Sequence, residues 1–345
     1  MKKLKILYLS KNMRDYKSAS YQHEVMSELS KQTKVFFYGP GFDGYNSNDS
    51  IFEVQSKIPF KVDCIIVGHS WLNDKDGDEV DPHPMLKLFS INTPKVIILN
   101  KEYTNLESKL NYIKDNHFDI AFTHHHDIKK YSQLTNVEFN FWPFAFSSEK
   151  FKSINIEKKI DIGFSGILQN QNKNANQSDI RVEIMKYFFH VIFDVPFKKK
   201  KRYGNVAIFW NSIPRSRLGR LFSKILGKHQ FLDSNAYVEK LSQTRIYINS
   251  LSPMGLISPR FFESMASGAL VLCEESSLYS NIFPKGVFIT FKKDLSDFEE
   301  IITTLLTNKT ETNKIVDQAY KLAYKEHTWE SRVSSLLLEI RKCIK

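Results

Sequence analysis

The segment Ile257–Glu275 combines residue types that can act together in binding. Ser258 is a good helix N-cap, and the proline after it suits the first helical position. Arg260 then falls in the first turn, and Glu263 follows three residues later on the same face. The positive end of a helix and an arginine fork match phosphate oxygens, and a glutamate can accept hydrogen bonds from a ribose diol. The separation, about 5 Å along the axis, suits a nucleoside diphosphate.

An ordinary surface helix has the same pattern. In that interpretation Arg260 and Glu263 form an exposed i,i+3 ion pair of little energetic consequence. Spacing alone does not decide between the two interpretations.

Three further side chains stand directly after predicted strands: His69, Glu102 and His124, the last followed by two more histidines. A histidine titrates near neutral pH and can take a proton from a hydroxyl group. A hydrogen-bonded loop histidine explains His69 equally well. Metal binding is the alternative for the run 124–126, but adjacent side chains diverge and no matching Cys or Asp spacing supports a zinc site.

The acidic run 73–81 resembles a calcium loop only superficially, because it lacks a glutamate at the twelfth loop position. We interpret it as a solvated loop. The sequence therefore predicts neither a metal nor a cofactor.

The net charge of +11 lies almost entirely in one segment, since ten basic residues and no acidic residue fall between Lys198 and Lys228. Within it, apolar residues at helical spacing predict a basic amphipathic helix that carries Arg217, Arg220, Lys224 and Lys228. Contact with an anionic membrane or an anionic acceptor is the favoured interpretation. The alternative is an apolar stripe packed on the domain with a solvated charged face; nucleic acid ranks last because no binding motif accompanies the charges.

Composition excludes several classes of protein. Hydrophobic residues make up 42% and charged residues 25%, with only 13 Gly and 11 Pro, which is typical of a folded globular chain. Three cysteines in 345 residues suggest reduced thiols rather than a disulfide scaffold. No apolar run is long enough to span a membrane, and the short apolar stretch near the N-terminus predicts a first β-strand. We expect a cytoplasmic protein.

Short apolar runs alternate with helical patterns along the chain, which predicts parallel sheets covered on both faces. The class is α/β, with two doubly wound Rossmann-like domains that face a cleft. The predicted strands are 5–10, 35–38, 63–68, 95–100, 120–123, 137–141, 161–168, 245–251, 269–273 and 287–291. We expect an N-terminal domain over 1–150, a C-terminal domain over 151–326 with a basic insertion at 198–228, and a final helix over 327–345 that packs back on the first domain.

The segment Ile257–Glu275 resembles the nucleotide-sugar-binding segment of GT-B glycosyltransferases, in particular of the CgeB-like branch of the glycosyl transferases group 1 superfamily. Further resemblances occur in the same order along the chain: KEYTNLESKL (101–110), FDIAFT (118–123), FWPFAFSSEKF (141–151), DIGFSGIL (161–168), YVEKLSQTRIYINSLS (237–252) and EHTWESRVSSLL (326–337). They cover the C-terminal domain well and the N-terminal domain loosely.

The resemblance implies roles for individual residues. Glu263 matches the second Glu of the family's E-x7-E pattern, which binds the donor ribose, and Arg260 matches the residue near the donor phosphates. Ser165 and Gly166 match the glycine loop at which the backbone approaches the diphosphate. Gly255 occupies the position of the first Glu, which is a departure from the pattern.

These observations predict a metal-independent glycosyltransferase of polysaccharide biosynthesis that moves a hexosyl or related sugar from a nucleotide-activated donor to a glycan or lipid-linked acceptor. The donor binds the C-terminal domain and the acceptor the N-terminal domain, with the protein peripheral on the inner face of a membrane. The departure at Gly255 keeps an alternative open: a catalytically inactive nucleotide- or glycan-binding module at a membrane or coat assembly. A sugar transferase that modifies nucleic acid is a third hypothesis.

Overall fold

The chain forms two compact units in a computed structural model. The described residues are 2–13, 20–75, 77–151, 156–166, 180–188, 204–210, 232–252 and 255–344. Unit 1 comprises 1–144 together with 329–345, and unit 2 comprises 145–328. The chain therefore leaves unit 1 and returns to it for its last helix.

Unit 1 contains a six-stranded parallel sheet in the order β2-β1-β3-β4-β5-β6. Its strands are β1 (Lys5–Leu9), β2 (Lys34–Tyr38), β3 (Cys64–Val67), β4 (Lys95–Leu99), β5 (Ile120–Thr123) and β6 (Glu138–Phe141). Every residue of β3, β4 and β5 is buried. Continuous apolar runs of this kind are expected when helices cover both faces of a sheet.

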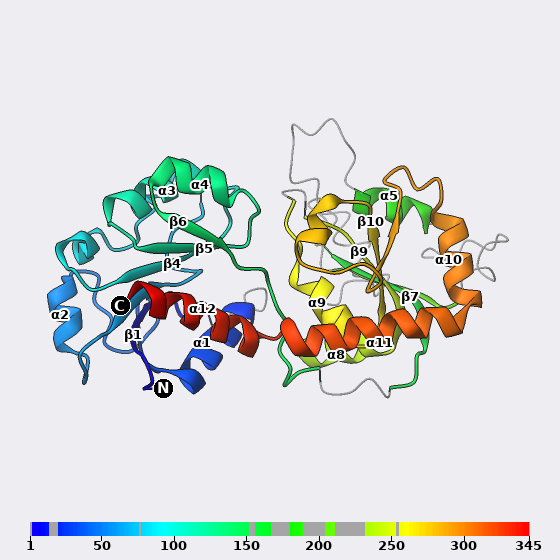
Figure 1. The fold of residues 1–345 in the computed structure, drawn as a ribbon, viewed down its shortest axis with the longest axis horizontal. Helices are drawn as coiled ribbons and strands as arrows, with labels where there is room; N and C mark the ends of the chain where they lie inside the picture. The colour runs from blue at the N-terminus through cyan, green and yellow to red at the C-terminus, as the bar shows by residue number, and fades with distance from the viewer. Residues whose placement is uncertain are drawn as a thin grey trace, which may run out of the picture. The chain divides into compact units, whose positions relative to one another are not determined.

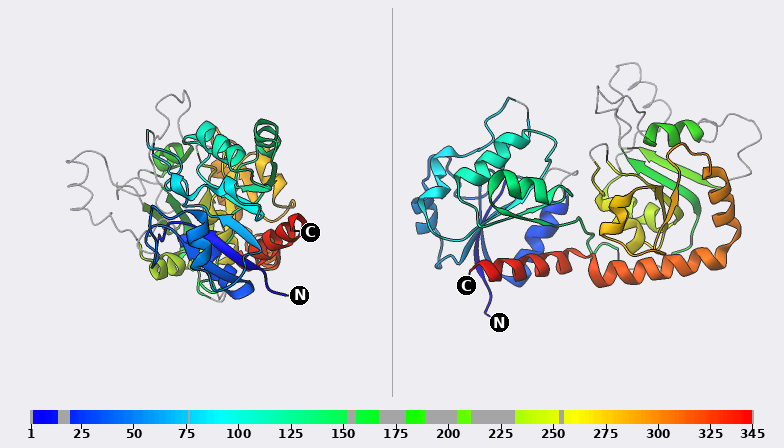
Figure 2. Two further views of the ribbon diagram at one scale, coloured as in Figure 1. Left: turned by 90° about the vertical axis from the view of Figure 1, so that its left-hand side faces the viewer. Right: turned by 45° about the horizontal axis from the view of Figure 1, so that its top comes forward.

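Helices cover both faces of this sheet (Figure 1). They are α1 (Ser20–Gln32), α2 (Ile51–Ser56), α3 (Leu106–Asp115), α4 (Ile128–Thr135) and α12 (Trp329–Cys343), with the short turns η2 (Pro84–Leu86) and η3 (Leu88–Ser90). The core on one face joins alternate strand residues to α2, α3 and α4. Figure 2 shows α1 and α12 on the other side of the sheet from α3 and α4.

Unit 2 contains a five-stranded parallel sheet in the order β11-β10-β9-β7-β8. Its strands are β7 (Ile160–Gly166), β8 (Val206–Trp210), β9 (Thr244–Asn249), β10 (Leu270–Glu274) and β11 (Ile289–Phe291). Its helices are α5 (Ile180–Tyr187), α8 (Ser234–Ser242), α9 (Pro259–Ala266), α10 (Phe298–Thr307) and α11 (Lys309–Glu326), with the turn η4 (Ser277–Asn281).

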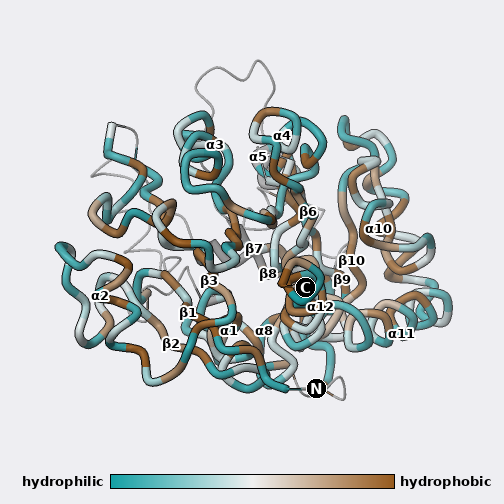
Figure 3. Tube along the Cα trace, turned by 60° about the vertical axis from the view of Figure 1, so that its left-hand side comes forward, coloured by the Kyte–Doolittle hydropathy of each residue, from teal (hydrophilic) through white to brown (hydrophobic). Residues whose placement is uncertain are grey.

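One core of unit 2 joins the even-numbered residues of β7 and β9 to α5, α10 and α11. Brown, hydrophobic segments gather along the strands in Figure 3, while α11 alternates between teal and brown as an amphipathic helix does. The odd-numbered residues of β7 and β9, Ser165 and Tyr247 among them, point to the opposite face of the sheet.

The predicted α/β class is confirmed, and all ten predicted strands occur with small shifts at their ends. The sequence prediction missed β8, because Val206–Trp210 lies inside the segment 198–228 that we had assigned to a basic insertion. It also missed α2 and α4, which are only six and eight residues long. The units divide at 144 and 328, and the domain boundaries predicted from the sequence are 150 and 326.

The predicted basic helix, with Arg217, Arg220, Lys224 and Lys228, lies outside the described residues. Among the helices that are described, none has the length and apolar character needed to cross a membrane.

The closing helix α12 makes a direct test of the unit 1 core possible, because two neighbouring leucines differ in burial. Leu336 is fully buried, whereas Leu338 is 53% exposed. We expect Leu336→Ala to lower the free energy of unfolding by about 2–5 kcal/mol, the usual cost of a buried cavity. Leu338→Ala is the matched control and should change it by less than about 0.5 kcal/mol. Urea denaturation measures both, and equal losses would show that α12 does not pack as described.

Candidate functional site

The strand order of unit 2 reverses between β7 and β9, because the chain passes from β7 outward to β8 and then returns to the other side of β7. The loops that follow β7 and β9 therefore diverge, and ligands of such sheets bind at this point, beyond the carboxyl ends of the strands. Ser165 and Gly166 end β7, and Asn249 ends β9. The predicted glycine loop thus begins at the switch point.

The helix α9 begins with polar atoms that lack partners. Ser258 is its N-cap in extended conformation, and Pro259 is the first helical residue. Among the described residues, the Ser258 hydroxyl makes no capping hydrogen bond and is buried without a partner. The Nε of Arg260 is likewise buried and unpartnered. A hydroxyl and a guanidinium donor at the positive end of a helix are suited to an anion.

Two tyrosines make hydrogen bonds next to this helix, one to α9 and one between two strands. Tyr237 of α8 donates a hydrogen bond of 2.7 Å to Oε2 of Glu263. The hydroxyls of Tyr247 and Ser165 lie 2.5 Å apart. Burial raises the pKa of both tyrosines, and the charge of Arg260 acts on each of them in the opposite direction. Four segments, β7, α8, β9 and α9, therefore bring these side chains together.

Gly255 has a physical reason to be glycine. Its φ is 75°, in the left-handed region where a side chain is strained. The backbone N–H of Gly255 donates to the carbonyl of Ser252, and the N–H of Ser252 donates to the carbonyl of Leu256, both at 2.9 Å. The loop before α9 is thus a tight turn whose conformation disfavours the glutamate that the resembling family carries here.

A polar cluster at the ends of β9 and β10 was missed at the sequence level. Arg181 of α5 is buried, and its Nε donates to Oγ of Ser250 at 2.7 Å. Glu274 ends β10, accepts from the N–H of Leu251 at 2.8 Å, and has its pKa raised by burial. The Nδ2 of Asn249 is buried without a partner. The position of Glu274 at the end of a predicted strand was the available signal.

In unit 1 the structure brings His69 and His124 together. Their Nε2 atoms are 3.0 Å apart, and their rings stack at 5.0 Å. Nδ1 of His124 lies 2.6 Å from the carbonyl oxygen of Trp142, which can only accept, so this nitrogen carries the proton. In a neutral His124, Nε2 is then the acceptor, and His69 donates from its own Nε2.

This arrangement leaves Nδ1 of His69 with its lone pair. That nitrogen is buried and has no hydrogen-bond partner in the part of unit 1 that the structure describes. Burial, together with His124, lowers the pKa of His69 well below its usual value, and burial lowers the pKa of His124 to about 3. Both rings are therefore neutral at pH 7, and of the two only His69 has an uncommitted acceptor nitrogen.

Glu102 lies beyond the end of β4 and is 4% exposed. Its Oε1 accepts a short hydrogen bond from the hydroxyl of Thr123, which in turn accepts from the N–H of His125 at 3.0 Å. Its Oε2 is buried without a partner, and burial raises the pKa of the carboxyl group. A carboxyl group in this setting is better suited to holding a proton than to carrying a charge.

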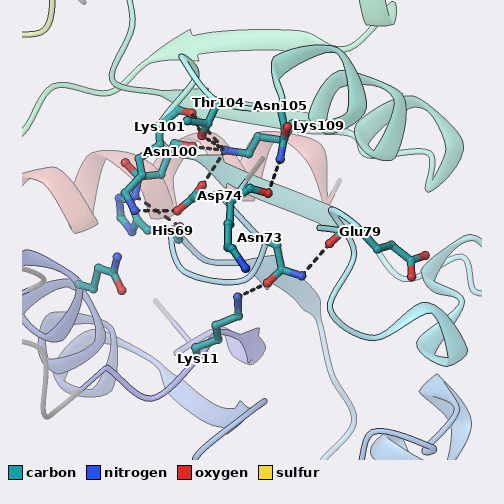
Figure 4. A network of polar contacts seen from close by, with 12 residues as sticks. Lys11, His69, Asn73, Asp74, Glu79, Asn100, Lys101, Thr104, Asn105 and Lys109 are labelled. Carbon is teal, nitrogen blue, oxygen red and sulfur yellow. Dashed lines mark hydrogen bonds and ion pairs between the residues drawn. The ribbon is translucent and has the colours of Figure 1, made fainter. Parts of the chain in front are cut away.

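A network around a buried lysine holds the loops next to these groups (Figure 4). The ammonium of Lys109 is fully buried; it pairs with Asp74 at 2.7 Å and donates to the carbonyls of Asn100 and Lys101 at 3.0 and 3.1 Å. Lys101 also pairs with Asp74, at 2.8 Å. Asp74 is thus tied to the loop after β4, while Lys75, Asp78 and Glu79 of the same acidic run are exposed, as the prediction of a solvated loop has it.

No group of three His, Cys, Asp or Glu side chains suited to a metal ion occurs in the part of the chain that the structure describes. The predicted donor residues Ser165, Gly166, Ser258, Arg260 and Glu263 all belong to unit 2, and His69, Glu102 and His124 all belong to unit 1.

Comparison with solved structures finds the same architecture over nearly the whole chain. Similar structures include a glycosyltransferase from Rickettsia africae (TM-score 0.59, 11% identity, 100% of both chains) and sucrose-phosphate synthase from Thermosynechococcus elongatus (TM-score 0.60, 9% identity, 99% of both chains). An Anabaena protein in complex with UDP and glucose is also similar (TM-score 0.56, 11% identity, 98% of this chain and 100% of the other). The fold is GT-B.

A family model described as glycosyl transferase-like matches residues 203–338 of this GT-B chain. The matched stretch includes α9 and all of its candidate donor residues, but not Ser165 or Gly166. The search of curated proteins finds no match to the sequence.

The hydrogen bond from Tyr237 to Glu263 yields a prediction for nucleotide binding. We expect Tyr237→Phe to weaken the affinity for UDP by about 3–10-fold, because Glu263 loses the donor that orients it and one hydrogen bond is worth about 1 kcal/mol. Isothermal titration with UDP measures the change. Tyr320→Phe on α11 of the same unit is the control. An unchanged affinity in Tyr237→Phe would mean that this hydrogen bond does not contribute to nucleotide binding.

Proposed function

We propose that this protein is a glycosyltransferase that moves a sugar from a nucleotide-activated donor to an acceptor hydroxyl, and that it belongs to the CgeB-like branch. The GT-B fold and the glycosyl transferase-like family match support the general activity. The bound UDP and glucose of the similar Anabaena protein support a nucleotide sugar as donor.

The observation that carries the proposal is the pair of buried, unpartnered donors at the start of α9, the Ser258 hydroxyl and Nε of Arg260. A buried polar group without a partner costs about 1–3 kcal/mol, and native proteins retain few of them. Oxygens of a diphosphate would satisfy both donors. Glu263, one turn further along α9, would then accept from the ribose hydroxyls.

The same donors would stabilise the negative charge that develops on the departing diphosphate, the role that a metal ion has in other transferases. We therefore propose a metal-independent reaction. Ser165 and Gly166, where β7 ends at the switch point, would border the diphosphate from the side of the sheet.

The acceptor is assigned to unit 1, with His69 as the base that takes the acceptor proton. Its Nδ1 is the free acceptor nitrogen of the histidine pair, whereas both nitrogens of His124 are engaged. His124 would accept from Nε2 of His69 and so support the imidazolium that forms. Glu102 would act as a protonated hydrogen-bond donor to the acceptor or its product.

The finer features remain part of the proposal: a hexosyl or related sugar, a glycan or lipid-linked acceptor, and a role in polysaccharide biosynthesis. We also propose a cytoplasmic protein that binds the inner face of an anionic membrane through Arg217, Arg220, Lys224 and Lys228.

The second candidate function is a catalytically inactive nucleotide- or glycan-binding module. The left-handed backbone at Gly255 favours it, because this turn disfavours the glutamate of the family's pattern. Release of free nucleoside diphosphate from a sugar nucleotide by the purified protein would exclude it.

The donor site is tested by charge removal at two positions of α9. We expect Arg260→Ala and Glu263→Ala each to weaken UDP binding by about 10-fold or more, because charge-assisted hydrogen bonds are worth about 1.5–3 kcal/mol. Glu300→Ala removes an exposed carboxylate of the same unit and should leave the affinity unchanged. Thermal shift and calorimetry with UDP, GDP and ADP measure the effect. Normal affinity in both variants would refute the site.

The proposed base is tested by a pair of histidine variants. His69→Asn should lower kcat by about 10²–10⁴-fold while UDP affinity stays normal, because a general base contributes to the chemical step only. His117→Asn is the control: His117 is exposed with φ 53°, a conformation that asparagine adopts readily. A loss of UDP affinity equal to the loss of turnover would assign His69 a structural role.

A further inference from the structure

A cavity of unit 2 lies away from the switch point. Its volume is about 180 Å³, and its lining includes Lys158, Arg245, Leu305, Lys309, Asn313 and Val316. Lys158 precedes β7, Arg245 is the second residue of β9, and Lys309 begins α11. The cavity therefore opens at the amino ends of the parallel strands, roughly 20 Å along β7 from Ser165 by strand rise.

Three cations from three separate segments surround this cavity. The ammonium of Lys158 donates to the carbonyls of Ser242 and Ser267, at 2.8 and 3.0 Å, where α8 and α9 end. These two bonds use two of its three N–H groups. Burial, and after it the charge of Arg245, lowers the pKa of Lys158 to about 8. The two hydrogen bonds thus hold the ammonium of Lys158 in place, although burial and the charge of Arg245 disfavour its charged form.

The negative charge next to the cavity is small. The nearest carboxylate oxygen to Arg245 is Oδ1 of Asp161, at 3.7 Å from a guanidinium nitrogen, too far for a hydrogen bond. Oδ2 of Asp161 already accepts from the N–H of Asn205 at 2.8 Å. Among the described residues, the guanidinium of Arg245 therefore has one distant ion pair, and Arg245 lines the cavity.

Lys309, the first residue of α11, adds to the excess of positive charge around the cavity. A lysine at a helix N-terminus opposes the helix dipole, which favours negative charge there. Glu311 lies in the same first turn but does not line the cavity. Lys309 is exposed at the cavity rim and can turn toward a bound anion.

We propose that this cavity binds a phosphate group, either inorganic phosphate or a small phosphate monoester. The planar fork of Arg245 matches two phosphate oxygens, Lys158 and Lys309 contribute point charges, and the amide of Asn313 can donate a further hydrogen bond. The apolar walls, Leu305 and Val316, limit the room for a large ligand. The bound group would link the starts of β7, β9 and α11. This site is independent of the proposed transferase activity.

The test compares two lysines of one helix. Thermal unfolding of the full chain is followed with increasing sodium phosphate, at ionic strength held constant with sodium chloride. For the wild type, we expect the midpoint temperature of unfolding to rise with phosphate until it saturates. Arg245→Gln and Lys309→Gln should lower the apparent affinity for phosphate at least 10-fold. Lys314→Gln should leave that affinity unchanged. Lys314 is exposed on α11, carries the same charge and does not line the cavity.

Further measurements distinguish inorganic phosphate from a phosphate monoester, and this cavity from the proposed donor site. Arg245→Lys keeps the charge without the fork, so it should bind phosphate more weakly than the wild type and more tightly than Arg245→Gln. Arg260→Ala should keep the full phosphate response, because it lies at the other edge of the sheet. Glycerol 3-phosphate in place of phosphate shows which source binds more tightly. An equal response in the wild type and Arg245→Gln, or an equal loss in Lys309→Gln and Lys314→Gln, would overturn the proposal.

Discussion

The burial of one side of α9 constrains the two charged candidate donor residues of unit 2, Arg260 and Glu263. Phe261, Phe262 and Met265 are each at most 1% exposed, and the ring of Phe261 stacks on Phe283 at 4.6 Å. Because these residues occupy adjacent positions of a 3.6-residue turn, Arg260 and Glu263 must lie on the remaining part of the helix surface. The aromatic packing holds the helix start in place, so the Ser258 hydroxyl and Nε of Arg260 stay at the switch point although no partner for them occurs among the described residues.

In both units the ends of parallel strands bring polar side chains together, but the side chains differ in chemistry. In each unit the strand order reverses once, between β1 and β3 in unit 1 and between β7 and β9 in unit 2. Residues that follow these strands come together because parallel strands end at a common edge. In unit 1 the rule gathers histidines and a carboxyl group whose pKa values favour neutral forms. In unit 2 it gathers hydroxyls, an arginine and a glutamate, which are suited to binding an anion and a diol.

Buried polar atoms without partners mark both places. Atoms of His69, Glu102, Asn249, Ser258 and Arg260 are in this state, and all lie at or just beyond the carboxyl edges of the sheets or at the start of α9. The fully buried His83 is a further case: its ring packs against Tyr38, Tyr45 and Trp71, and Asp49 acts against the lowering of its pKa that burial causes. Atoms of other residues, Gln22 and His23 among them, are in the same state in the part of the chain that the structure describes, so these atoms support a binding site only together with the strand ends and the helix start that carry them.

Local sequence determined much of this protein. Apolar runs and helical spacing predicted the parallel α/β class, the strands and the start of α9, because these depend on neighbours within one or two turns. Sequence could not pair His69 with His124 or Tyr237 with Glu263, which are 55 and 26 residues apart. Nor did it show that Lys109 pairs with Asp74, or that β8 completes a sheet inside a basic segment. Only the tertiary structure decides such contacts, because strand order and sheet edge, and not separation along the chain, determine which side chains meet.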